Sequence, residues 1–117
     1  DNNTNSGLFI GAATTSNTTV QVDGSDFINS TTFNLQLTNT SSGTYNVDFG
    51  GGGLGSTGQN RIFTSGNEDV FGNLNGSAVS AQSNWWGVGT GLAGGELNLT
   101  TGGSVDATSP LAVDPRP

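Results

Sequence analysis

Apolar side chains recur at every second position in short segments spread along the chain. These segments are Leu8-x-Ile10, Val20-x-Val22, Phe33-x-Leu35-x-Leu37, Tyr45-x-Val47-x-Phe49, Val79-x-Ala81 and Leu97-x-Leu99. A period of two places the apolar side chains on one face of an extended strand. Clusters of Gly, Asn, Ser and Thr separate the segments, and no window carries a helical apolar stripe. The pattern therefore predicts an all-β chain of short strands joined by turns.

The predicted strands recur at a nearly constant spacing. The segment 16–23 matches the segment 41–48 at four of eight positions, so the pattern repeats with an offset of 41 − 16 = 25 residues. The same shift places Leu8 on Phe33 and Ile10 on Leu35. A repeat of this length with two or three short strands is what one coil of a parallel β-helix requires. The sequence thus predicts a right-handed parallel β-helix, a solenoid of about four coils of roughly 25 residues each.

The repeat divides the chain into coils and predicts its core. A third unit places Val79 on Tyr45 after a longer interval, and a fourth places Val105 on Val79. We expect one unit over residues 1–117, with coils at approximately 7–31, 32–58, 59–90 and 91–110 and a proline-rich exit at 110–117. The predicted inward core ladder consists of Val22, Val47 and Ala81, which stack in one row, together with Ile10 and Leu35. An antiparallel sandwich with coincidental spacing is the alternative fold.

Composition supports a thin core and excludes several partners. Asn, Ser, Thr and Gly make up 63 of the 117 residues, whereas 31 % are hydrophobic, as in a column whose coils mostly face water. Nine acidic residues and two arginines give a net charge of −7. A binder of nucleic acid or of an anionic membrane needs the opposite balance. No apolar run approaches the ~20 residues of a membrane span, so we expect no membrane insertion.

The residue inventory removes most catalytic chemistry. The chain has no Lys, His or Cys, which excludes a Ser-His-Asp triad and His/Cys metal centres. We therefore predict no enzymatic activity, no catalytic residue and no resident cofactor. The repeat stacks Asp23 on Asp48, and carboxylates ~5 Å apart repel unless a cation lies between them. A Ca²⁺ ion on this carboxylate ladder is the functional hypothesis, and solvated side chains that splay apart are the alternative.

The most specific motif is Asn84-Trp85-Trp86-Gly87. The two Trp side chains supply enough apolar area to close the end of a thin core, while Asn and Gly suit the turn that leaves it. Exposed Trp pairs also bind sugar rings, so the alternative is a sugar-stacking platform of Trp85, Trp86 and Tyr45. The first interpretation predicts a structural lid and the second a carbohydrate-binding site.

The motif, together with Val79-Ser80-Ala81, the segment 102–106 and Ser109-Pro110-Leu111, resembles the last coils of right-handed parallel β-helix proteins. These are the pectin-lyase-like proteins, a group that includes many bacterial surface and secreted proteins. The resemblance implies the fold and a processed, secreted protein located outside the cell or on its surface. The resemblance does not indicate any particular activity, because one fold hosts many functions.

The two ends of the predicted column differ. Pro110, Pro115 and Pro117 cannot donate to a strand ladder, so the upper end is expected to be closed. The segment 1–6 contains no proline and no apolar lid, which leaves the lower edge open to pairing. We therefore predict a non-catalytic extracellular structural module, a subunit or segment of a surface fibre, filament or adhesin stalk that self-associates by end-to-end coil stacking. The alternative is a carbohydrate-binding β-helix module of a secreted polysaccharide-acting or adhesion protein.

Overall fold

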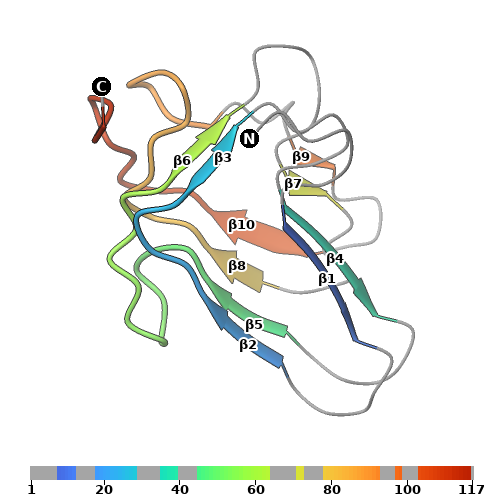
Figure 1. The fold of residues 1–117 in the computed structure, drawn as a ribbon. Helices are drawn as coiled ribbons and strands as arrows, with labels where there is room; N and C mark the ends of the chain where they lie inside the picture. The colour runs from blue at the N-terminus through green and yellow to red at the C-terminus, as the bar shows by residue number, and fades with distance from the viewer. Residues whose placement is uncertain are drawn as a thin grey trace.

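The computed structural model describes residues 8–12, 18–28, 35–39, 45–63, 71–72, 78–92, 97–98 and 103–116. These segments contain short strands and no helix, so none of them could cross a membrane as a helix. The strands are β1 (Leu8–Ala12), β2 (Thr18–Gln21), β3 (Asp26–Ile28), β4 (Leu35–Asn39), β5 (Tyr45–Asp48), β6 (Arg61–Phe63), β7 (Phe71–Gly72), β8 (Ala78–Ser80), β9 (Leu97–Asn98) and β10 (Ser104–Asp106) (Figure 1). The prediction of an all-β chain is confirmed for the described residues.

The strands form three sheets in which every described pairing is parallel. Sheet A has the order β1-β4-β7-β9, sheet B the order β2-β5-β8-β10, and sheet C pairs β3 with β6 (Figure 1). An isolated parallel bridge from Arg61 to Trp85 extends sheet C. We call each set of successive strands a tier: β1, β2 and β3 form the first, β4, β5 and β6 the second, β7, β8 and Trp85 the third, and β9 and β10 the fourth. Sheets A and B therefore gain one strand in each tier, and sheet C gains a strand in the second tier and a bridge in the third.

The pairing register lies two positions away from the predicted repeat. Leu8 pairs with Leu35, where the repeat places it on Phe33, and Val20 pairs with Val47, where the repeat places it on Tyr45. The predicted offset was therefore wrong, and Ile10 pairs with Leu37 rather than Leu35. Side chains alternate with a period of two, so a shift of two positions leaves every side chain on its predicted face. Alternation therefore could not separate the two registers, and local sequence identity favoured the wrong one.

The same shift corrects the core ladder in sheet B. Val20, Val47, Val79 and Val105 are successive Cα partners, and the predicted placement of Val105 on Val79 is confirmed. Beyond the strands, Val22 N donates to Asp48 O at 2.9 Å, Phe49 N to Ser80 O at 2.7 Å and Ala81 N to Asp106 O at 2.8 Å. The parallel pairing therefore continues in a second row that contains Val22, Phe49, Ala81 and Ala107. The prediction that Val22, Val47 and Ala81 share one row was wrong, because Val47 belongs to the neighbouring row.

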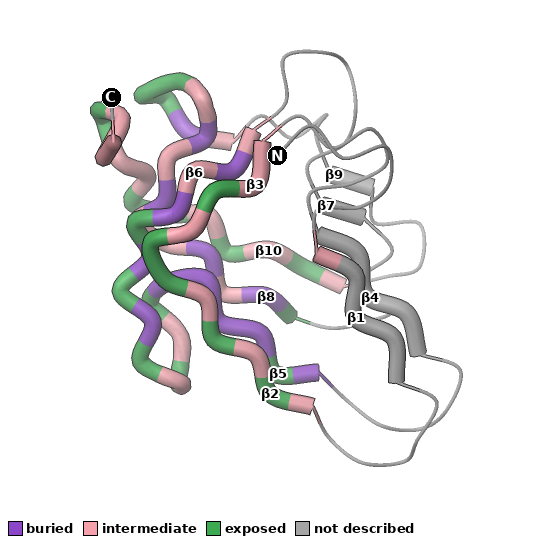
Figure 2. The backbone as a smooth tube through the Cα atoms, viewed as in Figure 1, coloured by how far each residue is buried: buried purple, intermediate pink, exposed green. Residues whose placement is uncertain are grey.

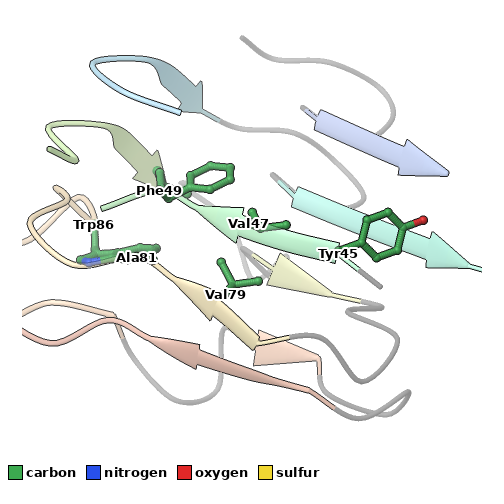
Figure 3. Close-up of a cluster of buried hydrophobic side chains, with 7 residues drawn as sticks. Tyr45, Val47, Phe49, Val79, Ala81 and Trp86 are labelled. Atoms are coloured by element: carbon green, nitrogen blue, oxygen red, sulfur yellow. The ribbon is translucent and has the colours of Figure 1, made fainter. Parts of the chain in front are cut away.

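Side chains from all three sheets meet in one core. Its buried apolar members are Tyr45, Val47, Phe49, Ile62, Val79, Ala81 and Trp86, against which Leu8, Val20, Val22, Phe27, Leu92, Val105 and Ala107 pack. Figure 3 shows Tyr45, Val47 and Phe49 side by side along the second tier, with Val79 and Ala81 from the next tier beside them. Figure 2 shows the buried residues concentrated in β5, β8 and the segments that follow them. Burial is thus deepest in the second and third tiers.

Candidate functional site: the polar corner between sheets B and C

The chain turns from sheet B to sheet C through a corner built from residues 22–26, 48–61, 80–85 and 106–116. Two asparagines in it are fully buried, Asn60 and Asn84, both at 0 % exposure. Asn84 Oδ1 accepts from Asn60 N at 3.0 Å and from Asn60 Nδ2 at 2.9 Å. Both side-chain amides donate to Phe49 O, at 3.0 Å from Asn60 and 2.9 Å from Asn84, and Ser25 N donates to Asn60 Oδ1 at 2.8 Å. This asparagine ladder satisfies backbone groups that the turn would otherwise leave unpaired.

The residues of the Asn-Trp-Trp-Gly motif do not act as predicted in every case. Asparagine and glycine were expected to suit the turn; the residue with positive φ next to Asn84 is Ser83, at 58°. Asn84 is instead the upper member of the asparagine ladder. Gly87 does adopt a positive φ of 86°, and a Cβ there would lie 3.0 Å from Phe63 Cβ. The motif therefore needs glycine both for its backbone conformation and for close packing.

The two tryptophans lie on opposite faces of the third tier. Trp86 is 3 % exposed and belongs to the core, whereas Trp85 is half-buried and pairs with Arg61 on the outer side. Tyr45 is 6 % exposed and lies in the core with Trp86. The predicted sugar-stacking set of Trp85, Trp86 and Tyr45 is therefore not brought to one accessible surface. Trp86 adds apolar area to the core, and of these three aromatic residues Trp85 lies on an outer face.

Asp48 organises the glycine-rich segment that follows it. Its carboxylate is fully buried and accepts four backbone N–H groups, from Gly50 and Gly52 at 2.9 Å each and from Leu54 and Ser56 at 3.1 Å each. We call this arrangement the Asp48 cage. Burial opposes the charge, but the four hydrogen bonds outweigh it and hold the pKa of Asp48 below its ordinary value.

Glycine is required in the cage for steric reasons. A Cβ on Gly52 would lie 2.7 Å from Asp48 Cγ and 2.9 Å from Ser80 Cβ, and Gly51 has a φ of 75°. The loop thus packs against Ser80 of the third tier, while the Asp48 carboxylate that it surrounds belongs to the second tier. Only a residue without a side chain lets the backbone N–H groups approach the carboxylate this closely.

Asp23 binds the far end of the same loop from the first tier. Its Oδ1 accepts Ser56 Oγ at 2.8 Å and Thr57 N at 2.7 Å, and the hydrogen bond from Ser56 is the main reason its pKa lies below the ordinary value. The predicted stacking of Asp23 on Asp48 is wrong, because Gln21 is the Cα partner of Asp48. Hydrogen-bond donors of the loop surround both carboxylates in the structure. Among the described residues no cluster of three or more acidic side chains could hold a metal ion.

The charged residues of the corner gather on the outer side of sheet C. Arg61 Nη1 lies 3.1 Å from Asp26 Oδ2, and Arg61 Nε lies 3.0 Å from Asp114 Oδ1. Arg116 also pairs with Asp26, through Nη2 and through Nε, the latter at 3.2 Å. The two arginines of the chain thus meet at one carboxylate. We call this group of Asp26, Arg61, Asp114 and Arg116 the arginine clamp.

Sequence reasoning missed the asparagine ladder, the Asp48 cage and the clamp. A signal for the ladder existed: Asn60-Arg61-Ile62 and Asn84-Trp85-Trp86 each place an asparagine two positions before a large apolar side chain. A signal for the clamp was the presence of only two cations in a strongly acidic chain. The cage carried no comparable pattern, because its donors are backbone groups.

Comparison of this chain with protein-family models, with curated proteins and with solved structures finds no match.

Proposed function

We propose that the chain is a right-handed parallel β-helix and acts as a non-catalytic extracellular structural module that assembles end to end with further copies. The observation that supports this proposal is the strand order, in which sheets A and B gain one strand in each of four tiers, sheet C follows over the first three, and every described pair is parallel. A chain that winds in one direction produces this order, and parallel crossovers are almost always right-handed. The four tiers are then four coils of the helix.

The two ends of sheet B match one another. Val20 and Val22 at the first tier and Val105 and Ala107 at the fourth are only half-buried, whereas Val47 and Val79 between them are 1 % and 2 % exposed. A copy whose fourth tier rests on the first tier of the next would continue both apolar rows. It would also pair the edge N–H and C=O groups of β2 and β10. Such a head-to-tail contact propagates into a filament.

The C-terminal segment follows a path compatible with this stacking. Leu111 N donates to Asn84 O at 2.9 Å, and Arg116 reaches Ser25 O and Gln59 O in the first two tiers. Its described residues therefore run along the side of sheet C rather than over the apolar rows of sheet B. The polar, Cys-free composition suits an exposed extracellular surface, and the net charge of −7 keeps it hydrated.

The test is a complementation experiment with variants that each block one end. Val20→Lys places a charge on the first tier and Val105→Lys on the fourth, while Thr19→Lys is the matched control on the outer face of β2. We expect concentration-dependent fibres from the native chain and from T19K in light scattering and negative-stain images at ~0.15 M salt, where repulsion is screened. V20K alone and V105K alone should stay monomeric, but a mixture should form 1:1 dimers, because each variant keeps one intact end.

Circular dichroism and Trp fluorescence establish that the variants are folded. A native chain that remains monomeric at all concentrations, or folded V20K and V105K that form fibres separately, would show that stacking through sheet B does not occur.

A second candidate function, carbohydrate binding, has one observation in its favour. Trp85 is half-buried on the outer side of sheet C, in register with Arg61 and Asp26. An aromatic ring next to charged hydrogen-bonding groups can hold a sugar ring. The check is protection of Trp85 fluorescence from acrylamide by a panel of polysaccharides, with Trp85→Phe as the control. Unchanged quenching with every polysaccharide would remove this candidate.

A further inference from the structure

The C-terminal residues 114–116 lie against strands that are distant in the sequence. Arg116 Nη1 donates to Gln59 O at 2.8 Å and Nη2 donates to Ser25 O at 3.3 Å, in addition to the pairing with Asp26. Its own backbone N–H donates to Asp114 Oδ1 at 2.9 Å, which fixes the turn that presents the side chain. One guanidinium therefore joins the first tier, through Ser25 and Asp26, to the second, through Gln59.

Arg61 completes the link from the strand side. Its guanidinium lies between Asp26 of β3 and Asp114 of the C-terminal segment, with ion-pair distances of 3.1 and 3.0 Å. The four side chains form an alternating series in which each carboxylate contacts an arginine. Their side-chain exposure ranges from 22 % for Arg61 and Asp114 to 36 % for Arg116 and 41 % for Asp26. Pairs this exposed are weakened by salt, although a network retains more of its strength than an isolated pair.

Strand β3 depends on these contacts more than the central strands of sheet B do. It is an edge strand whose described strand partner is β6, whereas β5 pairs with both β2 and β8. Its apolar anchor is Phe27, a half-buried ring with its centroid 5.6 Å from that of Phe49. The preceding residues are held by Gly24 N to Gly58 O at 3.0 Å and by Ser25 N to Asn60 Oδ1. A short edge strand whose apolar side chains, Phe27 and Ile28, are only half-buried belongs to the least stable part of a sheet.

We propose that residues 114–116 form an ionic latch that holds β3 on β6, and that the latch opens when the arginine–carboxylate pairs are screened or broken. With the latch open, β3 detaches while the second and third tiers stay folded, because their core is fully buried. Residues 114–116 thereby control whether the first tier presents a complete surface. This inference does not depend on end-to-end assembly.

Hydrogen exchange measured by mass spectrometry tests the latch on the full chain. The reporters are the amides of residues 24–28, and the amides of residues 47–49 serve as the internal reference. For Arg116→Gln at low salt we expect exchange at residues 24–28 to rise ~tenfold while residues 47–49 change little. Native protein should show the same local rise between ~0.02 and ~1 M salt, and R116Q should show a smaller salt response, because only the Arg61 pairs remain to be screened.

Two further variants make the result decisive. Asp26→Asn should accelerate residues 24–28, and adding R116Q to it should have less effect than R116Q has alone, because the two side chains share one interaction. Asp106→Asn removes an exposed carboxylate outside the clamp and should leave exchange at residues 24–28 unchanged. Equal acceleration of residues 24–28 and 47–49 in R116Q, or unchanged exchange in both, would overturn the latch.

Discussion

Two carboxylates in the same corner are held in opposite ways. Asp48 is fully buried and its partners are four backbone N–H groups of one loop. The side chain of Asp26 is 41 % exposed and its partners are two arginines from distant segments of the chain. Neutral donors at fixed backbone positions lose little strength to salt, whereas exposed charges on long side chains do. The corner thus combines a loop whose contacts are insensitive to salt with a clamp whose ion pairs weaken as salt increases.

Removing the caged carboxylate should have the largest effect. Asp48→Ala leaves four N–H groups without their acceptor in a buried site, so we expect a loss of about 3–5 kcal/mol in the free energy of unfolding. Urea titration followed by Trp fluorescence measures it. Asp106→Ala is the matched control, because Asp106 lies on the same outward row but is exposed, and its loss should stay within about 1 kcal/mol. Similar losses for the two variants would contradict the special role of the cage.

Crowding the cage without removing its charge should cost less. The Cβ introduced by Gly52→Ala would meet Asp48 Cγ at 2.7 Å, so the loop must shift and its N–H groups move off the carboxylate. We expect a loss of about 1–3 kcal/mol in the same urea titration. Gly53→Ala is the control, since nothing lies within 4 Å of a Cβ at that position. An equal loss at Gly53 would mean that contact with the carboxylate does not explain the effect, because Gly→Ala at an unstrained position should by itself be neutral or slightly stabilising.

Neutralising the clamp should cost less again. Asp26→Asn removes the charge that both arginines share, but the site is partly exposed, so we expect a loss of about 1 kcal/mol or less at low salt. In ~1 M salt the difference from the native protein should nearly disappear, whereas the loss caused by D48A should persist. A stability loss in D26N that does not depend on salt would mean that Asp26, like Asp48, is held by interactions that salt does not screen. It would contradict the proposed difference between the two carboxylates.

The pH dependence of stability offers the finest comparison. Burial opposes the charge of Asp26, but Arg116 and then Arg61 hold its pKa below the ordinary value, as the backbone N–H groups do for Asp48. A carboxyl group whose pKa is lowered on folding stabilises the native state above its unfolded pKa of about 4 and loses that contribution as pH falls through the folded value.

Stability should therefore be constant between pH 7 and 5 and fall below pH 4. Urea titrations from pH 7 to 2 measure how much stability each protein loses on acidification. D26N and D48N should each lose less than the native protein does, because each lacks one of the two carboxylates. The difference between native protein and D26N should shrink in ~1 M salt, whereas the difference between native protein and D48N should persist. A fall that salt reduces equally in the two variants would contradict this assignment.

The sequence indicated the inward face of β2, β5 and β8 correctly and the register between β2 and β5 incorrectly. Val22, Val47 and Ala81 point to the core as the alternation predicts, yet Val47 pairs with Val20. Alternation with a period of two defines the face but is unchanged by a shift of two positions. The small number of cations likewise pointed to the importance of the arginines without indicating their partners, because Arg116 meets Asp26 from the opposite end of the chain.

The sequence by itself determined that the described part of the chain is all-β, that its strands are short and recurrent, and which side chains of sheet B face inward, because alternation acts between neighbours along the chain. Tertiary structure decided the register, the burial of Asn60 and Asn84 and the partners of Asp48 and Asp26. These depend on the path of residues 49–59 between β5 and β6, where positive φ at Gly51, Gly55 and Gly58 folds the loop back over its own carboxylate. No periodic pattern encodes such a path, because it arises from contacts between residues that are distant in the sequence.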